Sequence, residues 1–319
     1  MARASTNSKS AKRKAKTPTF SGRVVRWVFT PMRLVTAATL ALLWLSWPVV
    51  ERQLPQLDNR SEYRVGVDQI VVTPPPRWVP EDIVGKVFAR AGFDESLSLL
   101  DPELSEKVAL AFYTYPWIER LKQVRKSFPA RVYVEVVYRK PVAMVEVAGG
   151  GYLPVDRHGH LLPEKDFSPA DIDRYPLIKG ISTAPVGYHG EPWGDPAVTG
   201  AAQLAAVLTK PNEAGQSWWT ALGLKTIFAP RRLAADEELD DLQFELGSPG
   251  GSRIVWGRPP STAHPAELTV AQKLERMAEY HRSYNGFDDG PAPFLIDIRD
   301  WHSTRRSLLA TDPARASRQ

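Results

Sequence analysis

The sequence predicts an α+β protein with an N-terminal single transmembrane helix, a β-α-α-β-β domain and then a mostly antiparallel β domain with two helices. Three observations predict this class. A basic tail precedes an uncharged apolar run. A strand, two helical patterns and two strands follow that run, and short strands separated by turn signals fill most of the remainder. A length of 319 residues suits two domains of roughly 100–200 residues plus an anchor.

Composition shifts divide the chain into six expected segments. They are a basic cytoplasmic tail at 1–33, a transmembrane helix at 34–50, a linker at 51–64, the β-α-α-β-β domain at 65–140, the β domain at 141–300 and a disordered tail at 301–319. The shifts on which these boundaries depend are changes in charge, in apolar periodicity and in proline and glycine content.

The positive charge of the chain is concentrated in its first 33 residues. The whole chain has 41 basic and 36 acidic residues, and nine of the basic residues lie in 1–33, which has no acidic residue. Residues 34–319 are therefore slightly acidic, which argues against a nucleic-acid partner. We interpret the tail as a topology signal that keeps the N-terminus in the cytoplasm and places the chain from Glu51 onward outside. The signal comprises Lys12, Arg13, Lys14, Lys16, Arg23, Arg26 and Arg33.

The apolar run at 34–50 contains 17 residues and no charge. As a helix it would be about 26 Å long, slightly shorter than a hydrocarbon core of about 30 Å, and Arg33 can extend the span by reaching to the headgroups. Two alternatives are a cleaved signal peptide and a buried core helix. The exit of the run has no small-residue cleavage site, and a core helix would not usually be uniformly apolar, so a single-pass membrane anchor is favoured.

The first domain outside the anchor is predicted from alternating and helical patterns. A β-branched strand at 63–72 ends at three prolines, and helical patterns follow at 80–92 and 101–116. Strands are expected at 117–124 and 131–138, and alternation in the second places Val132, Val134 and Val136 on one face. Two helices can cover one face of a three-stranded sheet and bury one small core.

Several short sequence motifs, and the order in which they occur, resemble the FtsQ/DivIB cell-division family. The β-α-α-β-β unit resembles a POTRA domain. The motifs are Tyr115-Pro116-Trp117-Ile118, Phe128-Pro129, Arg139-Lys140-Pro141-Val142-Ala143, Val155-Asp156-Arg157-His158-Gly159, Tyr175-Pro176-Leu177-Ile178-Lys179-Gly180 and Ile296-Asp297-Ile298-Arg299. The resemblance covers about residues 20–180 well and the remainder loosely. The proline- and glycine-rich loop at 182–196 and the acidic stretch Asp236–Asp241, within the segment 231–241, depart from the family pattern.

The second domain is predicted to consist of β-hairpins and two helices. Strands are expected at 143–148, 152–155, 224–228, 242–246, 253–256 and 294–298. Helices are expected at 197–209 and after Thr269, which with Gln272 forms a capping-box pattern. The resemblance implies the same, namely the β domain that follows POTRA in FtsQ.

No motif for chemistry emerges from the sequence. The chain has no cysteine, which excludes a disulfide framework, a thiolate zinc site and a cysteine nucleophile. His158 and His160 could chelate a metal, but a solvated turn is the favoured reading, and Asp171 and Asp173 read as loop acids. No nucleotide-binding, hydrolase or zinc-protease signature is present. We therefore expect a protein that is not an enzyme and has no cofactor, no metal and no small-molecule substrate.

Because no motif for chemistry is found, we expect the surface of the protein to bind protein partners. POTRA domains generally bind by adding a strand to an open sheet edge, and in the FtsQ family the end of the β domain receives the FtsB–FtsL partner. The resemblance implies that the last predicted strand makes or flanks this edge, through Phe294, Leu295, Ile296, Asp297, Ile298 and Arg299. The alternative is that this strand lies inside the sheet, or that it is a solvent-exposed edge protected against further pairing.

The resemblance implies a scaffold of the bacterial divisome in the inner membrane at the division septum, with its bulk in the periplasm or outside. It would recruit other single-pass division proteins, FtsB- and FtsL-like, through its POTRA and β domains. A POTRA-type adaptor for envelope secretion or assembly is the second hypothesis, and an anchored envelope enzyme is the third.

Overall fold

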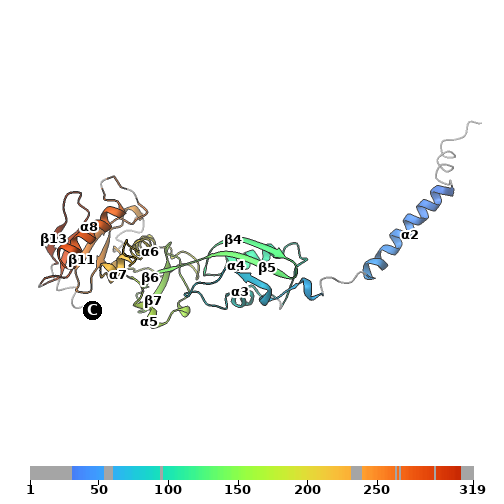
Figure 1. Cartoon of the computed structure of the whole chain (residues 1–319), viewed down its shortest axis with the longest axis horizontal. Coiled ribbons are helices and arrows are strands. Elements are labelled where there is room, and N and C mark those ends of the chain that lie inside the picture. Colours follow the sequence, from blue (N-terminus) through green and yellow to red (C-terminus); the bar gives the residue numbers. More distant parts are fainter. Residues whose placement is uncertain are drawn as a thin grey trace, which may run out of the picture. The chain divides into compact units, whose positions relative to one another are not determined.

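The fold is described from a computed structural model of the chain (Figure 1). The described residues are 31–53, 60–93, 96–230, 239–262, 264–265, 267–290 and 292–309. Two compact units make up the chain, residues 1–59 and residues 60–319. Most of the predicted topology signal (Lys12, Arg13, Lys14, Lys16, Arg23 and Arg26) lies outside the described residues, as does most of the 231–241 segment.

The predicted anchor forms a helix. Helix α2 spans Pro31–Gln53, 23 residues that include the whole apolar run. Its apolar side chains face outward, with Val35 62%, Leu40 66% and Trp44 79% exposed. None of the helices within the described part of the chain has the combination of length and hydropathy that a membrane crossing requires. The run at 34–50 is therefore confirmed as a helix but not as a membrane span.

The first part of the second unit contains the predicted order of one strand, two helices and two strands. Strand β2 (Ile70–Val72) is followed by α3 (Ile83–Ala91), α4 (Leu104–Tyr113), β4 (Ile118–Ser127) and β5 (Arg131–Tyr138). The strands form a three-stranded sheet in the order β2-β5-β4, in which β2 is parallel and β4 antiparallel to β5.

One core fills the space between these helices and this sheet. Val132, Val134 and Val136 are buried together with Val87 and Phe112 of the helices, as the alternation predicts. The single strand expected at 63–72 is in fact divided. Because residues Val67–Gln69 form a 3-10 turn, a short β1 (Arg64–Val65) separates from β2 and pairs with β3 (Leu97–Ser98).

The second part of this unit is built on an eight-stranded sheet. Its order is β13-β12-β11-β10-β9-β8-β6-β7, and the strands are β6 (Pro141–Glu146), β7 (Tyr152–Asp156), β8 (Leu177–Lys179), β9 (Thr226–Phe228), β10 (Phe244–Gly247), β11 (Arg253–Gly257), β12 (Phe294–Asp297) and β13 (Arg305–Leu308). Four of the seven neighbouring pairs are antiparallel and three are parallel, so the sheet is mostly antiparallel as predicted.

The two predicted helices supply the second core. Helix α6 (Pro196–Leu208) begins at Asp195, whose carboxylate accepts the N–H of Ala197 at 2.8 Å. Helix α8 (Val270–Ser283) begins at Thr269 with the predicted capping box. Both bury apolar side chains in the same core as the sheet. Two helices of four residues, α5 (Pro169–Ile172) and α7 (Trp218–Ala221), lie in connecting segments.

The two cores of this unit are joined through a polar junction. Arg139, which follows β5, donates from Nη1 to Asp156 Oδ2 at 2.6 Å and from Nη2 to the carbonyl of Gly190 at 3.2 Å. Trp117 Nε1 donates to Asp166 Oδ2 at 2.8 Å. Gly190 belongs to the proline- and glycine-rich loop at 182–196, so this loop contributes directly to the junction between the cores.

The C-terminal end of the sheet corrects two predictions. Strand β12 was expected to be the edge, but it is internal because β13 pairs with its other side. Strand β13 lies at Arg305–Leu308, within the segment 301–319 that the sequence predicts to be disordered. The sheet therefore extends one strand further than the alternation indicates, and the remainder of that segment, 310–319, lies outside the described residues.

Candidate functional site

The candidate site is the end of the eight-stranded sheet formed by β12 and β13. The register pairs Phe294 with Leu308 and Asp297 with Arg305, and Leu309 donates its N–H to the carbonyl of Pro293 at 2.8 Å. Because bonded positions alternate in an antiparallel pair, the N–H groups of Arg306 and Leu308 point away from β12. Within the described residues no strand pairs with that side, and all four residues of β13 are exposed.

Strand β13 is held on the sheet by cation–aromatic stacking. The Arg306 guanidinium lies 3.6 Å from the ring centre of Phe294 and 5.0 Å from that of Tyr284, and Arg306 also donates to the carbonyl of Asp289 at 2.7 Å. The stacking fixes the arginine over the aromatic rings.

The turn between β12 and β13 is held by one arginine of α8. The Arg276 guanidinium donates to the carbonyls of Ile298 at 3.2 Å and Trp301 at 3.0 Å, and also to the carbonyl of Asp300. A planar guanidinium can satisfy several carbonyls at once because its donors are arranged as a rigid fork. Arg276 therefore sets where the last strand begins.

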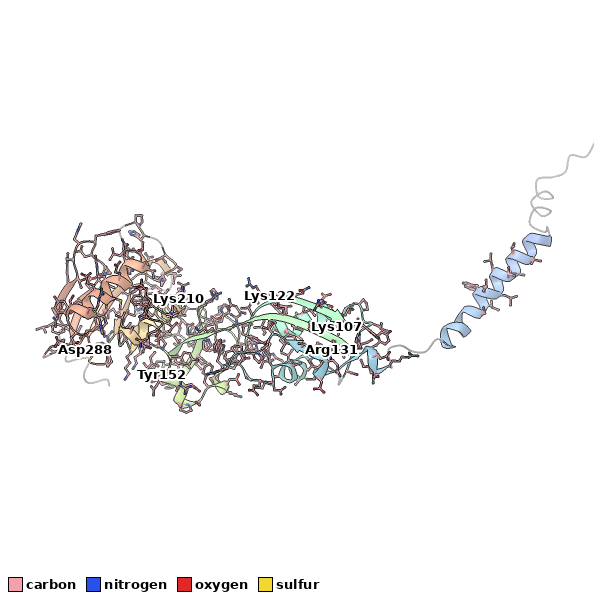
Figure 2. The ribbon with its side chains drawn as sticks, in the orientation of Figure 1. Lys107, Lys122, Arg131, Tyr152, Lys210 and Asp288 are labelled. Carbon is pink, nitrogen blue, oxygen red and sulfur yellow. The ribbon has the colours of Figure 1, made fainter. Side chains whose placement is uncertain are left out.

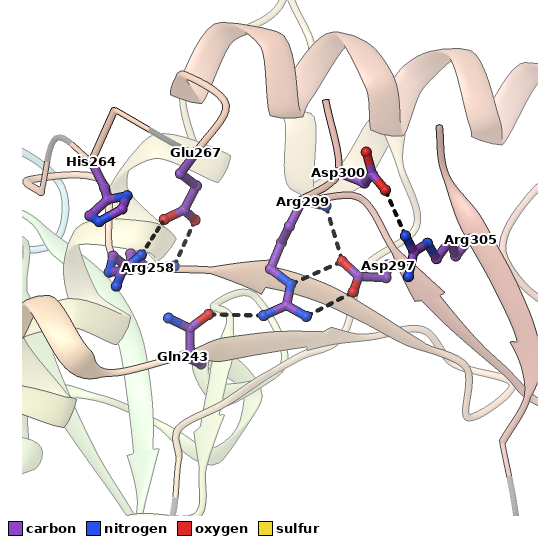
Figure 3. Close-up of a pocket in the computed structure, with 8 residues that line it drawn as sticks. All are labelled: Gln243, Arg258, His264, Glu267, Asp297, Arg299, Asp300 and Arg305. Atoms are coloured by element: carbon purple, nitrogen blue, oxygen red, sulfur yellow. Dashed lines mark hydrogen bonds and ion pairs between the residues drawn. The ribbon is translucent and has the colours of Figure 1, made fainter. Parts of the chain in front are cut away.

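A charged groove lies beside this end of the sheet (Figure 3). It has a volume of about 340 Å³, and its lining residues are Gln243, Arg258, His264, Glu267, Asp297, Arg299, Asp300 and Arg305. Arg299 holds Asp297 through two bonds, from Nε at 3.0 Å and from Nη2 at 2.8 Å, and also donates to Gln243 at 3.3 Å. On the strand side, Arg305 Nη2 donates to Asp300 Oδ2 at 2.9 Å.

The acidic groups of the groove are held in their charged forms. The hydrogen bond from Arg299 lowers the pKa of Asp297, and the backbone N–H of His302 lowers the pKa of Asp300. Burial would raise the pKa of Glu267, but bonds from Lys273 and Arg258 outweigh it and lower that pKa. Burial also lowers the pKa of Lys273, a side chain only 4% exposed. Carboxylates kept ionised in this way can form charge-assisted hydrogen bonds with cationic groups.

The residues predicted as a partner site divide between two faces. Phe294, Ile296 and Ile298 are buried in the second core, whereas Leu295 and Asp297 are partly exposed and Arg299 is exposed. The sequence reasoning missed β13, Arg276 and the ion pairs of the groove. Strand β13 has the sequence Arg-Arg-Ser-Leu and is exposed throughout, so no apolar alternation in the sequence indicates it.

The other candidates from the sequence have structural partners. His160 Nδ1 lies 3.3 Å from Asp156 Oδ1, and His158 Nε2 lies 3.8 Å from Glu119 Oε1. Asp171 caps α5 by accepting the N–H of Ser168 at 2.9 Å. In the part of the chain that is described, no three His, Asp or Glu side chains converge as a metal site would require.

Fold and site together define a class of protein: an α+β chain whose last sheet ends in an exposed strand beside a charged groove, features suited to binding another polypeptide. No family model matches the chain. Over 212 residues it is 26% identical to the cell division protein FtsQ of Anaeromyxobacter sp. (strain K). The match covers 66% of this chain and 60% of that relative. This similarity gives limited support to an FtsQ-like assignment and suggests a role in cell division.

Proposed function

We propose that this protein is a non-catalytic scaffold of the bacterial division machinery, FtsQ-like, that captures another division protein along the outer edge of β13. The similarity to a cell-division protein supports the cellular role. The observation that carries the binding mode is the exposed β13, whose outward N–H groups at Arg306 and Leu308 have no partner strand among the described residues. An added strand would satisfy these groups.

The neighbouring groove would provide selectivity. Arg305 at the start of β13 and Arg299 beside it are exposed, and each is paired with a carboxylate at the rim. Acidic or basic side chains of an incoming segment can replace one partner in these surface ion pairs. Breaking the original pair costs little free energy, because an exposed ion pair contributes only about 0–1 kcal/mol. Backbone bonds would then give affinity and charge pairs would set the register.

Attachment to the inner membrane is part of the proposal. It is supported by the 17 uncharged residues at 34–50 and by the outward apolar side chains of α2. The POTRA-like unit around β2, β4 and β5 would then be the first module outside the membrane. FtsB- and FtsL-like membrane proteins are the expected partners.

The test removes one outward N–H without disturbing the pairing of β13 with β12. Proline at an edge strand lacks a donor but is tolerated where the N–H faces away from the sheet. Leu308→Pro should therefore abolish crosslinking capture of division proteins from cells and displace the protein from mid-cell, whereas Leu308→Ala should retain both. Equal capture by Leu308→Pro and the wild type would refute strand addition at this edge, and normal septation after depletion would refute the division role.

A further inference from the structure

A second surface of the 60–319 unit combines exposed aromatic and cationic side chains. We define the hairpin-tip surface as Arg60, Tyr63, Arg64, Leu100, Lys126, Phe128 and Arg131. Phe128, at the turn between β4 and β5, is 62% exposed, and Leu100 is 44% exposed. Phe128 and Leu100 come from two different segments of the chain, and exposed apolar side chains that gather on one surface are typical of an interaction site.

Contacts among three chain segments make this a single surface. The rings of Tyr63 and Phe128 are 5.6 Å apart between centres. Ala130 donates its N–H to the carbonyl of Glu62 at 2.8 Å, and Lys126 Nζ donates to the carbonyl of Asp101 at 2.9 Å. Residues far apart in sequence are thus fixed side by side, and Figure 2 shows Arg131 and Lys107 at this end of the three-stranded sheet.

The charge of the surface is net positive. Arg60, Arg64, Lys126 and Arg131 are all exposed. The acidic residues nearby are Glu62 and Asp68 in the first segment and Asp101 and Glu103 in the next, and Lys107 pairs with both of the latter, at 2.8 and 3.3 Å. Exposed aromatics flanked by cations are the composition of surfaces that bind the headgroup region of anionic membranes.

We infer that the hairpin-tip surface docks on an anionic lipid surface, with Phe128 inserted among the headgroups. The inference rests on the proposed membrane attachment. Only six residues, 54–59, separate the end of α2 at Gln53 from Arg60. Because an extended chain spans at most about 3.6 Å per residue, Arg60 stays within about 25 Å of Gln53. If α2 lies in the membrane, this surface is held at the bilayer and encounters it repeatedly.

Docking would restrict the orientation of the whole 60–319 unit. The polar junction at Arg139 and Asp156 connects the first core to the second. Contact of the hairpin tip with lipid would therefore also limit where β13 is presented to membrane-anchored partners. The occupant is a phosphate-bearing lipid surface rather than a free anion, because Phe128 and Leu100 contribute apolar area that a free anion would not use.

The absence of cysteine allows a direct test in the full chain. The label is a fluorophore at Phe128→Cys, and the control is the same label at Val186→Cys, a side chain 87% exposed in the loop at 182–196. Each protein is reconstituted in vesicles of phosphatidylcholine, with or without phosphatidylglycerol, that carry a lipid-bound quencher. We expect quenching at position 128 only, stronger with phosphatidylglycerol and reversed by salt.

Paired charge variants separate a lipid contact from simple proximity. In the Phe128→Cys background, Lys126→Gln with Arg131→Gln should shift the docking equilibrium by roughly tenfold to thirtyfold, because each cation near an anionic surface contributes about 1 kcal/mol. Lys210→Gln with Lys225→Gln removes the same charge elsewhere and should leave the quenching unchanged. Circular dichroism verifies that each variant is folded.

Flotation of the vesicles distinguishes this inference from the proposed attachment. Chains that float with both lipid mixtures but show equal fluorescence at positions 128 and 186 would refute docking by the hairpin-tip surface. That result would still agree with membrane attachment through α2. Flotation that requires phosphatidylglycerol, together with quenching at 128, would support the surface and refute the anchor. Failure of both flotation and quenching would refute both.

Discussion

Replacing Asp156 by asparagine should weaken the junction between the two cores. Asp156 is 1% exposed, and its Oδ2 accepts the Arg139 guanidinium at 2.6 Å. Its Oδ1 accepts the backbone N–H groups of His158 and His160 at 2.8 and 2.9 Å. Asparagine preserves the shape of the side chain but removes the charge, so Arg139 would remain buried without a counter-ion.

The magnitude follows from the pKa of the carboxyl. Burial alone would raise the pKa of Asp156, but hydrogen bonds from His160 and Arg139 lower it from 3.8 to about 2. That difference corresponds to roughly 2 kcal/mol of extra stabilisation of the charged form. Removing one partner of a buried pair costs about 3–5 kcal/mol. We therefore expect Asp156→Asn to lower the free energy of unfolding by about 2–4 kcal/mol.

The pH dependence provides a second readout. Because the pKa of Asp156 is lower in the folded chain than in the unfolded chain, its stabilisation is complete above about pH 4 and is lost as the pH falls toward 2. The wild type should lose stability over this window, and the asparagine variant should lose less. Urea-induced unfolding followed by tryptophan fluorescence measures both quantities, since Trp117 lies at the junction.

A surface pair supplies the control for this experiment. Glu135 accepts Lys122 at 2.8 Å, but both side chains are about half exposed. Glu135→Gln should therefore change stability by less than about 1 kcal/mol. An Asp156→Asn variant as stable as Glu135→Gln, with the pH dependence of the wild type between pH 4 and 2, would refute a stabilising role for the buried Arg139–Asp156 pair at the junction.

Two further predictions concern backbone geometry. Gly190 has φ +94°, and an added Cβ would lie 2.9 Å from Pro116 Cα. Gly190→Ala should therefore lower the free energy of unfolding, measured with urea, by about 1–3 kcal/mol. Gly215→Ala should lower it by less, because Gly215 has a similar positive φ but its added Cβ would meet no atom within 4 Å. Arg276→Ala should release the turn after β12 and speed amide hydrogen exchange in β13, with exchange in β4 unchanged. Unaltered exchange in β13 would show that other contacts hold the strand.

The sequence by itself determined the local elements of this protein. Apolar periodicity located α3, α4 and α8, and alternation identified the buried face of β5. Both patterns can be seen in neighbouring residues, because side chains return to the same face about every 3.6 residues in a helix and every 2 residues in a strand. Capping chemistry fixed the start of α8 at Thr269 for the same reason. The uncharged run likewise predicted a helix at 34–50, which lies within α2 (Pro31–Gln53).

The tertiary structure alone decided which strand forms the edge of the sheet. The short, charged β13 carries no alternation that marks it as a strand, and its pairing depends on Phe294, Tyr284 and Arg276 supplied by distant segments. The junction of Arg139 with Asp156 and Gly190 likewise joins residues whose proximity no local pattern encodes. Edges, ion pairs and docking surfaces depend on contacts between segments far apart in sequence, and only the folded chain brings those segments together.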